Sequence, residues 1–68
     1  MKRIRIIDLL NKIANGESMP EDIEFKGESF WYYGVDCNYY SEKDFDRCLF
    51  DDLYNTVSIL NEEVEVYE

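Results

Sequence analysis

The residues best suited to chemistry in this chain are two cysteines and the acids around them. Cys48 and Asp52 stand four positions apart, so on a helix their side chains would lie next to each other. A thiolate and a carboxylate at that spacing could bind a divalent metal, with Cys37, and then Asp36 or Asp44, completing a tetrahedral zinc site. The competing interpretation is that Cys48 is a small core residue. The sequence therefore leaves open a structural zinc ion bound by Cys37, Cys48 and Asp52.

Acid–base or nucleophilic catalysis has little support in the sequence. The chain contains no histidine, which is the commonest general base and the usual partner of a catalytic cysteine. Neighbouring carboxylates such as Asp51 and Asp52 could act as a glycosidase pair, but a domain this small leaves little room for a substrate cleft beside its own core. We therefore expect a protein that is not an enzyme.

The negative charge is large and unevenly distributed. The net charge is −9; residues 1–35 carry six acids and five bases, whereas residues 36–68 carry ten acids and two bases. Such an asymmetry favours a basic protein partner. Direct binding to DNA or RNA is not expected, because it depends on Lys and Arg contacts to phosphate. The simpler alternative is that these acids form a solubilising surface.

Tyrosines accompany the acids in this half of the chain and are favoured as interface anchors. In "FWYY", strand alternation would turn either Phe30 and Tyr32 or Trp31 and Tyr33 toward the core, with the other pair exposed. The residues predicted to contact a protein partner are Asp36, Asp44, Asp46, Asp51, Glu62, Glu63, Glu65, Tyr39 and Tyr40.

Length and composition predict one folded domain spanning residues 1–68. The chain is 46% apolar and 16% aromatic, which favours a packed core over a disordered acidic tail. No apolar run approaches the ~20 residues of a membrane span, and the basic N-terminus lacks the continuous apolar stretch of a secretory signal. We expect a soluble cytoplasmic protein, in which the cysteines are free thiols or metal ligands.

The first half of the chain predicts an N-terminal strand, one helix and the two strands of a hairpin. Alternation in 2–6 predicts a strand, and Asp8 is a plausible N-cap for a helix that ends at Gly16. Residues 23–25 and 30–33 read as hairpin strands, with Gly27-Glu28 as the turn.

The second half predicts another helix and further strands. Ser41 and Asp44 resemble a capping box for a helix over 41–54, which would bury Phe45, Cys48, Leu49 and Leu53 on one face. Residues 56–60 and 63–68 are rich in β-formers, and the last strand could pair with 56–60 or with the N-terminal strand. The predicted fold class is α+β, a small antiparallel or mixed sheet of 4–5 short strands with two helices.

The string "IIDLLNKIANGESMPEDIEF" resembles small proteins encoded by phages and prophages of Gram-positive bacteria, and the likeness covers residues 4–25. The acidic, tyrosine-rich remainder is similar in size and charge to anti-CRISPR proteins, the small phage inhibitors of RNA-guided nucleases. The resemblance implies a non-enzymatic inhibitor that acts in the cytoplasm of the infected bacterium. Its target would be a type II CRISPR nuclease, whose positively charged channel binds nucleic acid.

Two alternatives from other classes stay open. One is a small zinc-stabilised structural or regulatory module. The other is a dimeric phage accessory protein that associates through its edge strands. The chain would then be a weak homodimer instead of a monomer.

Overall fold

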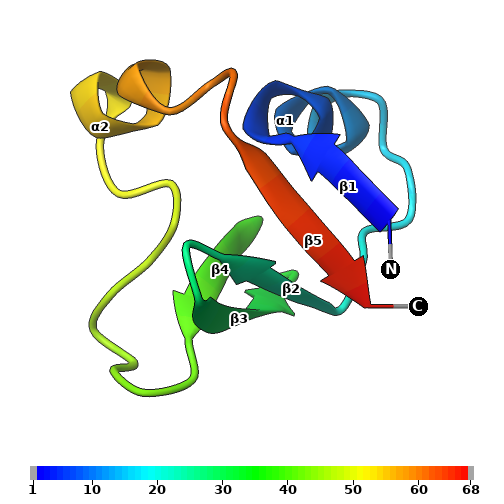
Figure 1. The fold of residues 1–68 in the computed structure, drawn as a ribbon. Helices are drawn as coiled ribbons and strands as arrows, with labels where there is room; N and C mark the ends of the chain where they lie inside the picture. Colours follow the sequence, from blue (N-terminus) through cyan, green and yellow to red (C-terminus); the bar gives the residue numbers. More distant parts are fainter. Residues whose placement is uncertain (1, 68) are drawn as a thin grey trace.

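The computed structural model describes residues 2–67 and folds them into one five-stranded sheet with two helices (Figure 1). The sheet has the order β1-β5-β2-β3-β4, and all neighbouring strands are antiparallel. The predicted α+β class is therefore confirmed. In chain order the elements are β1 (Lys2–Arg5), α1 (Ile6–Ala14), β2 (Asp22–Phe25), β3 (Glu28–Tyr33), β4 (Asn38–Ser41), α2 (Leu53–Ser58) and β5 (Glu63–Tyr67).

The last strand, β5, lies between the N-terminal strand and β2. Val64 pairs with Ile4, and Val66 pairs with Ile23. Of the two partners considered for this strand, the N-terminal one is correct. The predicted strand over 56–60 is wrong, because Thr56–Ser58 belong to α2 and Ile59 and Leu60 follow it in a turn.

The β2–β3 hairpin turns through Lys26 and Gly27. Phe25 pairs with Glu28 across the turn, and φ is +52° at Lys26 and +78° at Gly27. Two consecutive residues with positive φ match the twist of a tight hairpin, and glycine adopts this conformation without steric cost. The hairpin is confirmed, but its turn lies one residue earlier than predicted.

Helix α1 follows β1 without a loop, so it begins two residues before the predicted N-cap. Arg5 occupies the N-cap position, and its backbone N–H donates to Asp8 Oδ2 at 2.9 Å. Asp8 as N-cap is therefore wrong, although its carboxylate still accepts a hydrogen bond at the helix start. At the other end Gly16 has a φ of +69°, as predicted for the residue that ends this helix.

The predicted helix over 41–54 is the largest error. Ser41 N–H donates to Arg47 O at 3.0 Å, and Leu49 N–H donates to Tyr39 O at 2.8 Å. Residues 47–49 thus run beside the edge of β4, with a bridge between Tyr40 and Cys48. This extended path satisfies the β4 backbone and carries Leu49 into the core, while helix begins only at Leu53.

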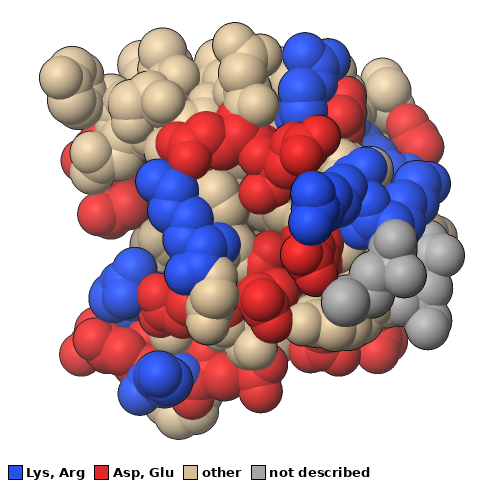
Figure 2. Space-filling model, in the orientation of Figure 1, with Lys and Arg blue, Asp and Glu red and all other residues tan. Residues whose placement is uncertain are grey.

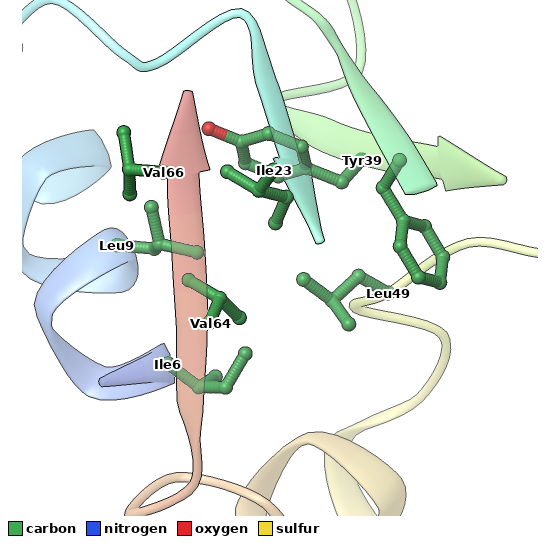
Figure 3. Packing of buried hydrophobic residues seen from close by; sticks show 8 residues of the cluster. Ile6, Leu9, Ile23, Tyr39, Leu49, Val64 and Val66 are labelled. Atoms are coloured by element: carbon green, nitrogen blue, oxygen red, sulfur yellow. The ribbon is translucent and has the colours of Figure 1, made fainter. Parts of the chain in front are cut away.

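The core lies between one face of the sheet and the segments that cover it (Figure 3). Ile6 and Leu9 of α1 pack toward β5, and Leu49 enters from the other side. Phe50, Ile59 and Leu60 pack against the same cluster. The fully or nearly fully buried hydrophobic residues are Ile6, Leu9, Ile23, Phe30, Tyr39, Leu49, Val64 and Val66.

Neither helix found in residues 2–67 has the length and apolar character that a membrane crossing requires.

Candidate functional surface

The face of the sheet that points away from the core carries charged and aromatic side chains. In each strand, the residues that alternate with the core positions point to this outer face. The pairings Arg3↔Glu65, Glu24↔Glu65, Asp22↔Trp31 and Trp31↔Tyr40 trace it across all five strands. The outer face is charged near β1, β5 and β2 and aromatic near β3 and β4.

In the charged half, acids alternate with bases (Figure 2). Arg3 Nη2 lies 3.4 Å from Glu65 Oε1, and Lys26 Nζ lies 3.0 Å from Glu62 Oε1. Exposed pairs of this kind add little stability, but each places a cation beside a carboxylate. Two of the predicted contact residues, Glu62 and Glu65, are therefore internally paired, whereas Glu63 is exposed and has no ion pair within residues 2–67.

The aromatic half forms a shallow recess, which we call the aromatic recess, lined by Trp31, Tyr33, Tyr40 and Phe45. The ring centroid of Trp31 lies 5.5 Å from that of Tyr33 and 5.8 Å from that of Tyr40. The Tyr33 and Tyr40 centroids are 6.1 Å apart. The recess has a volume of about 280 Å³, and Phe45 reaches it from the loop between β4 and α2.

Acids cluster in the stretch of chain that also supplies Tyr40 and Phe45 to the recess. The segment 36–52, here called the acidic segment, has six acids and two bases, a balance of −4. One of its bases, Arg47, lies 2.9 Å from Glu28 Oε1, an acid outside the segment. The acidic segment therefore carries half of the −8 excess of residues 36–68.

One carboxylate of the acidic segment contacts the recess directly. The hydroxyl of Tyr40 donates a hydrogen bond to Asp36 Oδ2. That hydrogen bond, with some desolvation, raises the pKa of Tyr40 to about 12. Tyr40 is thus protonated at neutral pH and fixes the Asp36 carboxylate at the rim of the recess.

The other acids predicted as contacts lie in the loop after β4. Asp44 Oδ1 accepts a hydrogen bond from Asp46 N–H at 3.0 Å, a turn in which an aspartate side chain bonds the backbone two residues on. Asp44, Asp46 and Asp51 are all exposed. They lie outside any helix, whereas a helix over 41–54 was predicted to carry them, but they remain within the same short segment.

Tyr39 is a correction to the predicted contact set. Its side chain is 0% exposed, and its hydroxyl donates to the Pro20 carbonyl at 2.7 Å. Tyr39 therefore stabilises the core and is not available to a partner. Of the two alternatives for "FWYY", Phe30 and Tyr32 pack toward the core, and Trp31 and Tyr33 line the recess.

The arrangement on which the zinc hypothesis was based is absent. Cys48 pairs with β4, whereas Asp52 caps α2 by accepting a hydrogen bond from Asn55 N–H at 2.8 Å, so the two do not share a helix. Cys37 is exposed, and its thiol lies 3.7 Å from Gly34 O. Within residues 2–67 no three Cys, Asp or Glu side chains are grouped to hold a metal. Zinc binding stays a prediction, but the structure does not place Cys48 and Asp52 side by side on a helix, which was the reason for proposing it.

Comparisons of the chain with protein-family models, with curated proteins and with solved structures found no match.

Proposed function

We propose that this protein is a non-enzymatic binding protein whose aromatic recess and acidic segment together contact a basic protein surface. The observation that carries the proposal is the position of exposed aromatic rings beside a segment with a charge of −4. Aromatic anchors surrounded by charged groups are typical of protein interfaces. The recess provides apolar contact, and the carboxylates provide attraction and orientation.

The partner proposed for this surface is a type II RNA-guided nuclease of the bacterial host, which the protein would inhibit in the host cytoplasm. Its support is the resemblance in size and charge to anti-CRISPR proteins. The physical basis is that a positively charged channel built for nucleic acid would also attract closely spaced carboxylates.

The experiment measures binding of the purified protein to a guide-loaded type II nuclease by interferometry at about 0.05 and about 0.5 M salt. Because exposed charges are screened at high ionic strength, we expect at least tenfold weaker binding at the higher concentration. A target DNA duplex bound beforehand should also block the complex. Affinity that changes with neither salt nor DNA would contradict this function.

A second candidate function is that of a dimeric accessory protein, and α2 is the observation that favours it. Leu53 and Tyr54 are 81% and 83% exposed, and none of the residues of α2 is buried. The corner of the molecule over α2 is largely uncharged (Figure 2), and β1 is a sheet edge. Light scattering over a wide concentration range tests this candidate, because a dimer through α2 should dissociate when Leu53 is changed to Asp.

The zinc-stabilised module is the remaining alternative. It predicts one zinc ion per chain in protein purified without chelator, and loss of stability when Cys48 is changed to Ser. Elemental analysis checks the first expectation.

A further inference from the structure

The aromatic recess has features that packing of the fold does not require. Tyr33 is 41% exposed and Phe45 is 70% exposed, and both belong to a patch on the face of the sheet that points away from the core. Exposed large rings gathered in one hollow are typical of a binding site.

The loop that carries Phe45 is shaped by its own hydrogen bonds. Arg47 N–H donates to Asp44 O at 2.9 Å, and Asp46 N–H donates to the Asp44 side chain. The two acids flank Phe45 in the chain, so the loop that supplies one wall of the recess also carries negative charge.

The charge around the recess selects a cation over an anion. Asp36 is bonded to Tyr40 at the rim, and the faces of aromatic rings attract positive charge. Within residues 2–67 the cation found over a ring is Lys26, which lies 5.3 Å from the centroid of Phe25. Arg47 is paired with Glu28. Within residues 2–67, no Lys or Arg is among the residues that line the recess.

We propose that the aromatic recess binds an arginine side chain of the basic partner, with the guanidinium against Trp31 and Asp36 as its carboxylate. This inference rests on the proposed function, since it names the group that the partner supplies. A guanidinium is planar, weakly hydrated and able to stack on a ring while it hydrogen-bonds a carboxylate, which a lysine ammonium does less well. The volume of the recess, about 280 Å³, is larger than that of a guanidinium group.

The test titrates the protein with three four-residue peptides, made of arginine, of lysine or of citrulline. The signal is the fluorescence emission of Trp31, which is the one tryptophan in the sequence. Citrulline has the shape of arginine without its charge. We expect the arginine peptide to change Trp31 emission and to bind about threefold to tenfold more tightly than the lysine peptide. The citrulline peptide should leave the emission unchanged.

Two alanine variants locate the binding site. Phe45→Ala removes one wall of the recess and should lower the affinity for the arginine peptide about threefold to tenfold. Tyr54→Ala removes another exposed ring, which belongs to α2, and should leave the affinity for the arginine peptide unchanged. Circular dichroism of both variants establishes that the fold is retained.

The outcomes separate this inference from the proposed function. Equal, salt-sensitive binding of the arginine and lysine peptides, with no change in Trp31 emission and no loss in Phe45→Ala, would overturn the arginine site and leave the acidic surface supported. A lack of binding by both basic peptides at low salt would count against both proposals.

Discussion

The Tyr40 hydroxyl donates a hydrogen bond to the Asp36 carboxylate and thereby joins the aromatic recess to the acidic segment. Tyr40 belongs to β4 and is positioned by the sheet, whereas Asp36 lies in the turn before it. Because the bond links the two side chains, the recess and this carboxylate are presented together. A partner that contacts one of them contacts the other.

The first prediction concerns the ionisation of Tyr40. The hydrogen bond to Asp36 raises the pKa of Tyr40 from about 10 to about 12, so Asp36→Asn should lower it toward 10. Because the pKa is higher in the folded state, the contribution of this bond to stability is complete below about pH 10 and is lost as pH rises through about 12. Tyrosinate absorbance during alkaline titration measures the shift, and Asp51→Asn is the matched control. Identical titration of Asp36→Asn and wild type would show that the bond is not made in solution.

A second prediction tests the buried role of Tyr39. Tyr39→Phe removes the donor to the Pro20 carbonyl and should lower the free energy of unfolding by about 1–2 kcal/mol. Tyr54→Phe, on an exposed ring, should change it very little. Urea denaturation of both variants provides the comparison, and equal stability of the two would mean that the Tyr39 hydroxyl bonds water instead.

The same residue predicts a pH dependence. Burial raises the pKa of Tyr39 well above its usual value. The contribution of Tyr39 to wild-type stability should therefore be constant up to about pH 10, where an unfolded tyrosine begins to ionise, and should fall above it. Tyr39→Phe lacks this ionisation and should lose less stability over the same alkaline range. A parallel decline in the two proteins would exclude Tyr39 as the cause.

A third prediction distinguishes the extended path of residues 47–49 from a helix over 41–54. In the structure Leu49 is 6% exposed and Leu53 is 81% exposed. Leu49→Ala should therefore lower the free energy of unfolding by about 2–5 kcal/mol, and Leu53→Ala by less than about 0.5 kcal/mol. Comparable large losses in both variants would instead support the helix, which buries both side chains.

Local patterns predicted the hairpin well. The alternation of apolar and polar residues in β2 and β3 and the turn residue Gly27 are local signals, a few residues apart. The sequence alone therefore located the hairpin turn to within one position. Helix α1 was found for the same reason, but its start was missed because β1 leads directly into it and Arg5, not Asp8, takes the N-cap position.

The second half depends on contacts between distant residues, and prediction was poorer there. The spacing of Phe45, Leu49 and Leu53 fits a helical face, but the free edge of β4 binds 47–49 through backbone groups that no side-chain pattern reveals. Phe45 was therefore expected in the core and is exposed in the recess. Similarly, strand alternation in "FWYY" defined two sets of side chains, and only the pairing with β2 and β4 decides which set faces the core.

The sequence predicted the amount of negative charge more reliably than the positions of the charged side chains in the fold. The acidic excess after residue 35 is a property of composition. Its distribution depends on strand order, which brings Arg3 beside Glu65 and Lys26 beside Glu62. Of the ten acids of residues 2–67 that make no ion pair, six lie in residues 36–52.

The central claim is that the acids of this segment bind a basic partner, and charge reversal tests it most directly. Asp44→Lys/Asp46→Lys changes the acidic segment, and Glu17→Lys/Glu21→Lys makes the same change in net charge at exposed positions before β2. The measurement is inhibition of DNA cleavage by a guide-loaded type II nuclease. We expect inhibition to be lost in the first variant, with the fold retained by circular dichroism, and to be kept in the second. Equal inhibition by both variants, or none by the wild-type protein, would contradict the account.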